Sequence, residues 1–490
     1  MTNRYLEAAL APINEEYTLT DLEVTGTIPT YLDGRYLRNG ANPISEVDPE
    51  LYHWFTGDGM VHGIRIRDGR AEWYGNRWVR GPLAKSKLGE APPGGHFGLY
   101  GIGANTNVIG HAGKTIALME GGLANYELTD DLDTVGVCDF DGTLTGGYTA
   151  HPKRDPETGE LHAVSYRWNR GNTVQYSVIG IDGRARRTVD IEVTGSPMMH
   201  DFSLTKRHVV FYDLPVTFDV GRAAAMAVPR GLRLPARLVL SALIGRIRIP
   251  DPIAARMPCG TDSDRRLPYS WNPDYPARVG VMPRDGSNGD VRWFDVEPCY
   301  VYHPMNAYDD GDTDIVLDVV RHPKMFDTDH SGPNEGPPTL DRWTVDLVGG
   351  KVRESRVDDR GQEFPRVDER VVGKPHRYGY APTVGEDGTA GDSLIKHDLV
   401  GENTQSRSFS ADKMLGEFVF HPSCPDAEED DGVLMGYLYD RPTDRSELAV
   451  LDARTLQDVA SVKLPHRVPA GFHGNWIPTQ AGFSDVTTAG

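Results

Sequence analysis

The chain has 490 residues, of which 51 are Lys or Arg and 71 are Asp or Glu, so its formal net charge at pH 7 is -20. A strongly acidic chain without a basic run argues against a nucleic-acid partner. The 54 glycines and 35 prolines predict many turns, and the length would hold two or three average domains, although one large closed β-architecture can also be this long.

The N-terminal sequence contains no apolar region of the kind found in signal peptides. The longest apolar stretch, around residues 238–244, is too short to span a bilayer. The cysteines are far apart and form no CxxC pair, so we predict free, buried thiols in a reducing compartment. They are Cys138, Cys259, Cys299 and Cys424. We therefore expect a cytoplasmic protein, and nothing in the sequence implies an obligate protein partner.

A strand-like run, a turn rich in Asp or Gly and a second strand recur seven times along the chain. The copies are residues 61–74, 124–137, 174–191, 279–296, 340–357, 393–409 and 447–464. Their spacing is roughly fifty to sixty residues, except between the third and fourth copies, which is typical of four-stranded propeller blades. The repeat predicts an all-β fold, a seven-bladed β-propeller forming one domain over residues 1–490. The alternatives are a double β-sandwich or two smaller barrels.

The irregular spacing predicts an insertion at about residues 217–275 that forms a cap or a membrane-docking segment. Residues 221–250 contain six arginines, no acidic residue and many apolar side chains. The arginines are Arg222, Arg230, Arg233, Arg237, Arg246 and Arg248. A short helix there would lay an apolar face into the headgroup region while the arginines meet anionic lipid, on the inner face of the membrane. The alternative is a lid packed on the propeller with its arginines solvated.

A further apolar segment between most of the hairpins is predicted to be an inner strand of each blade. Examples are residues 159–168, 208–216, 314–322 and 432–440. The C-terminal FHGNWIP has no outer hairpin after it, whereas residues 53–69 begin as a hairpin. The two ends of the chain are therefore expected to share a blade and close the ring.

Four histidines lie at the start of strand-like segments and are spread over more than three hundred residues. They are His151 in TAHPK, His200 in MMHDF, His303 in VYHPMNAY and His473 in GFHGNWIP. Neutral imidazoles without a Cys or Asp at ligand spacing suit a borderline metal such as iron or zinc, held by a closed scaffold. This spacing excludes a local zinc finger. The first three precede predicted inner strands, where the chain enters a blade near the axis, so one site would draw on the whole fold.

Sequence words found along almost the whole chain resemble the carotenoid cleavage oxygenase family. The words are GRYLRNGANP (34–43), HWFTGDGMVHG (53–63), ANTNVI (104–109), AHPKRDPETGEL (150–161), MHDFSLT (199–205), YHPMNAY (302–308), EFPRVDER (363–370), GEFVFHP (416–422) and FHGNWIP (472–478). Members of that family bind one Fe(II) through four histidines from different propeller blades. The resemblance implies one Fe(II) per chain on the four histidines, with loop and helical insertions forming a cap over the iron site.

The same resemblance implies three glutamates behind the ligands, namely Glu120 in LMEGG, Glu363 in EFPRVDER and Glu417 in GEFVFHP. Ligating imidazoles usually donate their second N–H to a carboxylate, which fixes the ring and tunes its basicity. His421 stands in an FHP context similar to that of the ligands, and spacing alone does not choose between it and Glu417 for the site. The family pattern assigns Glu417 to the site and leaves His421 a structural role.

The resemblance implies a dioxygenase that cleaves a double bond of a carotenoid or apocarotenoid with O2 and gives two carbonyl products. Four neutral imidazoles leave the iron its full positive charge and, in an octahedron, two free positions for dioxygen or water. No catalytic residue beyond the metal centre is implied. Aromatic residues beside the sequence words indicate an apolar tunnel for a lipophilic small molecule, with Phe364 and Phe472 as the first candidates.

Two alternative functions follow from the same residues. Stilbene-cleaving members of the family carry a lysine just before the first of the three glutamates, and this chain has Met119 there. A thioether suits a hydrocarbon polyene better than a phenol, so Met119 belongs to the predicted tunnel and cleavage of a lignostilbene or of resveratrol is the alternative. A propeller that binds lipid without catalysis is the other alternative.

Overall fold

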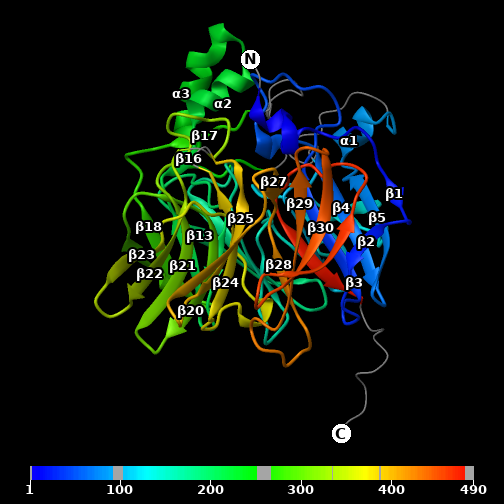
Figure 1. Ribbon diagram of the computed structural model, residues 1–490. Helices are drawn as coiled ribbons and strands as arrows, with labels where there is room; N and C mark the ends of the chain where they lie inside the picture. Colours follow the sequence, from blue (N-terminus) through cyan, green and yellow to red (C-terminus); the bar gives the residue numbers. More distant parts are fainter. Residues whose placement is uncertain (1–2, 92–102, 251–265, 334, 386–387, 480–490) are drawn as a thin grey trace.

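The computed structural model describes residues 3–91, 103–250, 266–333, 335–385 and 388–479. Within these residues the strands form seven antiparallel sheets and one additional strand pair (Figure 1). The fold is a seven-bladed β-propeller, so the fold class predicted from the repeat is confirmed and the sandwich and the double barrel are wrong. Each of the seven predicted hairpins is a pair of neighbouring strands in a different sheet.

The first sheet joins both ends of the chain in the order β1 (Thr18–Leu19), β5 (Arg70–Trp78), β4 (Gly59–Arg67), β3 (Gly34–Ala41) and β32 (Gly474–Pro478). The second contains β6 (Asn107–His111), β7 (Lys114–Leu118), β8 (Asn125–Leu128) and β9 (Thr134–Cys138). The third contains β10 (Lys153–Arg154), β11 (Leu161–Ser165), β12 (Thr173–Ile179) and β13 (Ala185–Glu192). The fourth contains β14 (Phe202–Leu204), β15 (His208–Asp213), β18 (Arg278–Pro283) and β19 (Arg292–Asp295).

The fifth sheet contains β20 (Tyr300–Asp310), β21 (Asp314–His322), β22 (Thr339–Asp346) and β23 (Lys351–Asp358). The sixth contains β24 (Tyr378–Val384), β25 (Ala390–Asp398) and β26 (Asn403–Ser408). The seventh has the order β2 (Glu23–Gly26), β31 (Asp458–Lys463), β30 (Arg445–Asp452), β29 (Gly432–Asp440) and β27 (Lys413–Leu415), and β28 (Val419–Pro422) also pairs with β29. Short helices lie before the first strand, within the first and fourth sheets, and between sheets: η1 (Arg4–Leu6), η2 (Ala8–Leu10), η3 (Trp54–Thr56), α1 (Pro82–Lys87), η6 (Asn288–Asp290) and η7 (Glu369–Val371).

The ring is closed at two places. Strand β32 pairs antiparallel with β3, from Gly34 opposite Pro478 to Arg38 opposite Gly474, so the two ends share a blade as predicted. Strand β2 also pairs with β31 on the outer side of the seventh sheet. The sequence analysis missed β2, because its four residues are all exposed and show no apolar alternation. The second pairing ties the N-terminal segment to the last blade and leaves β31 with a partner on both sides.

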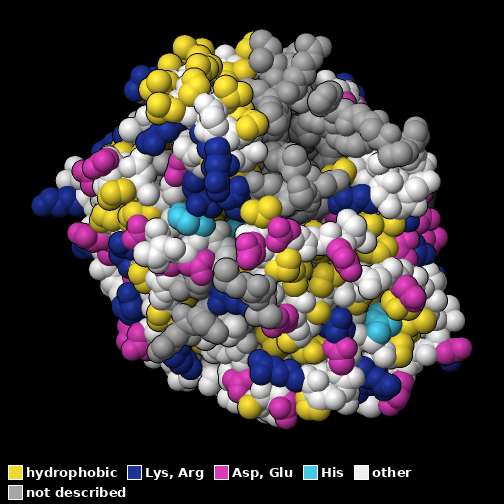
Figure 2. Space-filling view, turned by 90° about the horizontal axis from the view of Figure 1, so that it is seen from above, with side chains coloured by type: hydrophobic (Ala, Val, Ile, Leu, Met, Phe, Trp, Pro, Cys, Tyr) yellow, Lys and Arg dark blue, Asp and Glu magenta, His cyan; other side chains and the backbone are white. Residues whose placement is uncertain are grey.

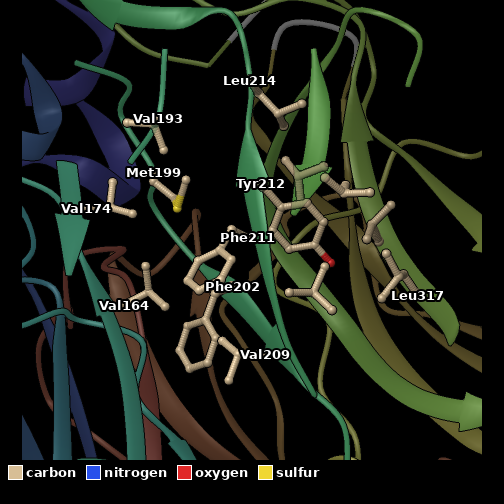
Figure 3. Packing of buried hydrophobic residues seen from close by; sticks show 14 of the residues in the cluster. Val164, Val174, Val193, Met199, Phe202, Val209, Phe211, Tyr212, Leu214 and Leu317 are labelled. Atoms are coloured by element: carbon tan, nitrogen blue, oxygen red, sulfur yellow. The ribbon is translucent and has the colours of Figure 1, made fainter. Parts of the chain in front are cut away.

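The core lies between neighbouring blades, where each inner strand is covered on both faces. Strands β21 and β29 are therefore buried almost along their whole length, whereas the outer strand β23 is largely exposed. Figure 3 shows how side chains of the third, fourth and fifth sheets meet, among them Val164, Val174, Phe202, Val209, Phe211 and Leu317. Complete burial of one such side chain contributes about 1.5–3 kcal/mol.

Helices occupy the predicted insertion. Between the two paired strands β16 (Val216–Phe218) and β17 (Tyr269–Trp271), its elements are α2 (Val220–Ala227), η5 (Arg230–Leu232) and α3 (Arg233–Leu243). The two α-helices project from one end of the propeller (Figure 1). Asp219 caps α2 by accepting hydrogen bonds from the backbone N–H groups of Gly221 and Arg222. Residues 251–265 of the insertion lie outside the described residues.

The cysteine prediction is partly wrong. Cys138 and Cys299 are free and buried, but Cys424 is free and exposed, in the loop between β28 and β29. Loops run over the surface, because a buried loop would leave backbone groups without partners. Cys259 lies outside the described residues. No helix in the described part of the chain is long and apolar enough to cross a membrane.

Candidate metal centre

The four histidines lie at the innermost strands of four different blades. His151 precedes β10, His200 precedes β14, His473 immediately precedes β32, and His303 lies within β20. His303 was predicted to precede an inner strand but lies within one. The innermost strands β10 and β14 were not predicted, because they have only two and three residues. In β20 the pairing register shifts on both sides of Pro304. Irregular pairing of this kind re-aims a side chain, and it occurs here directly at His303.

The structure brings all four imidazoles together. One nitrogen from each of His151, His200, His303 and His473 lies within 4.8 Å of the others, and all four residues are buried. The Nε2 atoms of His200 and His303 are 3.3 Å apart. Two nitrogens that bind one ion at about 2.1 Å are separated by about 3 Å, so this spacing fits a shared metal.

Three of the four rings are held by glutamates. Nδ1 of His200 lies 2.5 Å from Glu120 Oε2. Nδ1 of His303 lies 2.6 Å from Glu363 Oε2, and Nδ1 of His473 lies 3.0 Å from Glu417 Oε1. A ring that donates its Nδ1–H to a carboxylate keeps the Nε2 lone pair free for a metal. The three glutamates therefore stand where the family pattern puts them.

His151 provides an independent test of whether a metal fits. Its Nε2 atom is buried and has no hydrogen-bond partner among the described residues. A buried polar atom without a partner is costly, and a metal ion bound by the four rings would satisfy it. Nδ1 of His151 lies 4.0 Å from Asp201 Oδ2, beyond hydrogen-bond distance, and that carboxylate pairs instead with Lys153 Nζ at 2.8 Å. The donor set fits a metal ion.

The surroundings shift the pKa values of the ligand histidines in different directions. Burial, together with the three neighbouring imidazoles, lowers the pKa of His151 well below its usual range. Burial also lowers the pKa of His303, although Glu363 opposes this. For His200, burial acts to lower the pKa, but the Glu120 carboxylate outweighs it and raises the pKa. His151 and His303 are therefore neutral near pH 7, as metal ligands must be, and a proton on His200 would leave when a metal binds.

Two residues behind the glutamates were missed by the sequence analysis. Nε2 of His322 donates to Glu363 Oε1 at 2.8 Å, so this carboxylate bridges two imidazoles. Nη1 of Arg366 lies 3.3 Å from Glu417 Oε1. Sequence signals for both existed, since His322 stands in the same HPK context as His151, and Arg366 stands inside EFPRVDER.

These partners keep both carboxylates ionised. Burial acts to raise the pKa of Glu417, but Arg366 and then His473 lower it to about 2. Burial also acts to raise the pKa of Glu363, whereas His303 and His322 hold it far below its usual range. Ionised carboxylates are strong acceptors for imidazole N–H groups. The orientation of His303 and His473 is therefore fixed by two connected layers of side chains.

His421 lies outside the cluster. Its ring centroid is 5.4 Å from that of Trp476 and 6.4 Å from that of Tyr31. Burial lowers its pKa to about 4. The geometry therefore puts Glu417, and not His421, beside the four histidines, in line with the family pattern.

Two cavities meet at the histidines. The first, called here the polar cavity, has a volume of about 560 Å³, contacts His151, and is lined by charged side chains that include Lys153, Asp201 and Arg366. The second, called here the apolar cleft, has a volume of about 120 Å³ and contacts His200. Both cavities contact His303 and His473.

The three predicted tunnel residues, Met119, Phe364 and Phe472, all line the apolar cleft, together with Trp54, Phe55 and Tyr302. Phe364 has a φ of 53°, a left-handed conformation that costs about 1–2 kcal/mol for a residue with a side chain. This conformation accompanies a stacked contact of Phe364 with His303, with ring centroids 5.2 Å apart, and a hydrogen bond from the Phe364 backbone N–H to Glu363. The chain thus accepts local strain where the cleft meets the metal centre.

Comparison with known proteins identifies the family. The family model described as retinal pigment epithelial membrane protein matches residues 10–478. The carotenoid cleavage oxygenase of Mycobacterium tuberculosis is 59% identical, with 97% of this chain and 98% of that protein covered. The lignostilbene dioxygenase structure from Pseudomonas brassicacearum has a TM-score of 0.81 at 25% identity, covering 98% of this chain and 100% of that one. Cobalt-substituted apocarotenoid oxygenase of Synechocystis has a TM-score of 0.78 at 27% identity, covering 96% and 97%. The chain therefore belongs to the carotenoid cleavage oxygenase family.

Proposed function

We propose that the protein is a non-haem Fe(II) dioxygenase that cleaves one carbon–carbon double bond of a carotenoid or apocarotenoid with O2. The observation that carries this proposal is the buried four-histidine cluster, backed by glutamates and adjoining an apolar cleft. In the reaction the double bond breaks and each of its carbons gains one oxygen atom. Two carbonyl products form, and the atoms and electrons balance without another oxidant or reductant.

His151, His200, His303 and His473 would hold the iron, one ion per chain. When bound, iron would supply the redox chemistry that allows O2 to react with an alkene. Borderline metals accept imidazole ligands in general, so the donor set alone does not separate iron from zinc. The membership of the family and the redox demand of the reaction favour iron.

The residues of this chain orient the ligand rings, bind the substrate and exclude water. Glu120, Glu363 and Glu417 fix three of the ligand rings, as described above. Phe55 and Phe472, with ring centroids 5.7 Å apart, form part of the wall of the apolar cleft beside the metal centre. The polar cavity is the larger of the two, but its charged walls would have to lose water to bind a polyene, which is unfavourable. Chemistry therefore favours the apolar cleft for the substrate.

Product analysis tests the proposal. Iron-loaded protein would be incubated with a panel of carotenoids and apocarotenoids under 18O2, and the products identified by mass spectrometry. We expect two carbonyl products from one double bond, each carrying one labelled oxygen atom when exchange with water is suppressed. An absence of cleavage across the panel would contradict the proposal and favour lipid binding without catalysis.

Cleavage of a stilbene is the second candidate, favoured by the structural similarity to the lignostilbene dioxygenase. The residue that argues against it is Met119, which is buried and lines the apolar cleft. A phenol hydroxyl placed against it without a partner loses roughly 1–3 kcal/mol. A hydroxystilbene whose phenol lies against Met119 should therefore be cleaved poorly, and Met119→Lys should reverse the bias. Faster turnover of resveratrol than of every polyene tested would contradict the carotenoid assignment.

We also propose that the helical insertion docks this cytoplasmic protein on the anionic inner face of a membrane. Five large apolar residues of the insertion are more than half exposed. They are Leu232, Leu234, Leu238, Val239 and Ile247. On the same end of the molecule, Figure 2 shows a patch of yellow hydrophobic side chains with dark blue Lys or Arg side chains beside it. Leu123, three residues after Glu120, packs against the small core of these helices, so the insertion adjoins the segment that forms the cleft wall.

Not all six arginines are available to lipid. Arg233 donates to the backbone carbonyls of Ala225 and Val228 near the end of α2, and Arg222 donates to the carbonyl of Leu267. These two arginines have a structural role that the sequence analysis did not foresee. The exposed arginines that remain are Arg230, Arg237, Arg246 and Arg248.

Liposome binding tests the docking proposal. Each arginine near an anionic surface contributes about 1 kcal/mol, so changing Arg230, Arg237 and Arg246 to Glu should strongly lower co-sedimentation with phosphatidylglycerol vesicles. Raised salt should weaken binding of the unmodified protein. The control carries the same charge change at Arg70, Lys351 and Arg353, which are exposed outside the insertion. Equal vesicle binding by both triple variants would leave the helices as a structural lid.

A further inference from the structure

A tyrosine of the apolar cleft has a hydroxyl group without a partner. Tyr302 is 3% exposed and lines the cleft, and its hydroxyl makes no hydrogen bond with the described residues. Buried tyrosine hydroxyls usually find a partner, because an unpaired polar group in an apolar environment is unfavourable. The position of Tyr302 beside the metal centre therefore requires an explanation.

Packing prevents the ring from turning toward another partner. Edge-to-face contacts surround it, with ring centroid distances of 4.7 Å to Tyr300, 4.9 Å to His200, 5.2 Å to His322 and 5.9 Å to Phe55. Dense packing of this kind makes other rotamers costly. The hydroxyl thus stays in a cleft whose other walls are mostly apolar.

A second polar group in the same cleft is also unpaired. Nε1 of Trp54 is buried without a hydrogen-bond partner among the described residues, and Trp54 lines the apolar cleft. Its ring is held between Tyr5 at 5.5 Å and Phe472 at 4.6 Å. An indole N–H can only donate, whereas a phenol can donate or accept. A ligand that satisfies both groups must carry a hydrogen-bond acceptor, and in a carotenoid or apocarotenoid that acceptor is an oxygen atom.

We propose that Tyr302, with Trp54 as a second donor, binds an oxygen atom of the substrate. The cleft then selects a polyene with a hydroxyl or carbonyl oxygen over the hydrocarbon of the same skeleton. Since Tyr302 packs directly on His200, the oxygen-bearing end of the substrate lies on the side of the cleft that adjoins the metal centre. This inference rests on the proposed function, because it assumes that the substrate occupies the apolar cleft.

The test compares matched ligands on the iron-loaded, full-length protein. One pair is β-carotene and zeaxanthin, which share a skeleton and differ by ring hydroxyls. The other pair is an apocarotenal and the hydrocarbon that lacks its aldehyde oxygen. Both kcat/KM and binding, followed by quenching of tryptophan fluorescence, would be measured for the unmodified protein, Tyr302→Phe and Tyr148→Phe. Tyr148 is a matched control, because its hydroxyl is also buried and unpaired but does not line the cleft.

We expect the unmodified protein to prefer the oxygenated member of at least one pair. Tyr302→Phe should lower that preference about five- to tenfold, the effect of one neutral hydrogen bond, while Tyr148→Phe retains it. A preference that is absent, that survives in Tyr302→Phe, or that is lost equally in Tyr148→Phe would overturn the inference. If no polyene is cleaved, the proposed reaction fails, and the binding ratios still decide whether Tyr302 recognises oxygen.

Discussion

Three histidines of the metal centre each donate to a glutamate, whereas Nδ1 of His151 lies 4.0 Å from Asp201, beyond hydrogen-bond distance. The pKa values of His200 and His151 are shifted in opposite directions as a result. Glu120 raises the pKa of His200 against the effect of burial, whereas burial and neighbouring imidazoles lower that of His151. One metal site therefore holds its ligands in two ways. Three rings have a carboxylate behind them, whereas the ring of His151 is held, among the described residues, by packing.

Packing is what remains to hold His151. Its ring lies 4.3 Å from that of His200 and 4.7 Å from that of His473. A ring fixed in this way is already neutral and loses no proton when a metal binds. Variants at the two kinds of ligand therefore measure how much a carboxylate adds to the iron affinity of a histidine that packing already holds in place.

The largest effect is expected from removal of a glutamate-backed ligand. His200→Ala or His303→Ala should abolish both iron content and cleavage, because one ligand is lost and the glutamate behind it is left without its main partner. Iron would be measured by atomic absorption and cleavage by product analysis. His421→Ala is the control and should keep near-normal iron, since that ring lies outside the cluster. Full activity of either ligand variant would refute the ligand assignment.

Weakening the carboxylates should have the next largest effect. Glu363→Gln and Glu417→Gln keep the side-chain shape but remove the charge that the ligand N–H groups meet. Loss of the group behind a ligand typically lowers metal affinity or activity about 10- to 100-fold. Iron titration monitored by activity and by metal content would show it. No change in either variant would mean that packing alone orients all four rings.

A smaller effect is expected one layer further out, at His322. His322→Ala removes one hydrogen bond to Glu363, which still accepts from His303 and from the Phe364 backbone. We expect a loss of iron affinity below about tenfold, less than for the glutamates themselves. His322→Gln offers an N–H in place of Nε2 and should restore part of the loss. A loss in His322→Ala as large as that in Glu363→Gln would show that His322, and not the carboxylate, controls the ring.

The smallest effect is expected behind His151. Asp201→Asn removes a charge that pairs with Lys153 but makes no hydrogen bond to the histidine. Iron affinity should change by less than the tenfold that marks the lower end for a carboxylate behind a ligand. The same iron titration applies. A loss of iron affinity equal to that in Glu417→Gln would show that His151 is held by a carboxylate like the other three ligands.

The local pattern of the sequence was sufficient for the blades, and the sequence words that resemble the family identified the ligands. Period-two apolar runs around Asp- or Gly-rich turns located the seven hairpins, because a half-buried hairpin must alternate regardless of its neighbours. The four histidines stood out because each begins a strand-like segment in a recognisable sequence word. The sequence missed strands that are too short or too exposed to alternate, namely β2, β10 and β14.

Only the tertiary structure decided which side chains meet. Glu120 reaches His200 across 80 residues of sequence, and His322 reaches Glu363 across 41. Tyr302 is one of the aromatic residues within the sequence words that indicated a tunnel, but only its surroundings in the fold leave its hydroxyl unpaired. A local pattern shows which face of a strand is apolar. Hydrogen bonds between side chains of distant segments depend instead on how the blades pack around the axis of the propeller. The sequence therefore determined the blades by its local pattern, and the four ligands and three glutamates by its resemblance to the family. The closure of the ring decided which glutamate meets which histidine, and it placed His322 and Arg366 behind two of these glutamates.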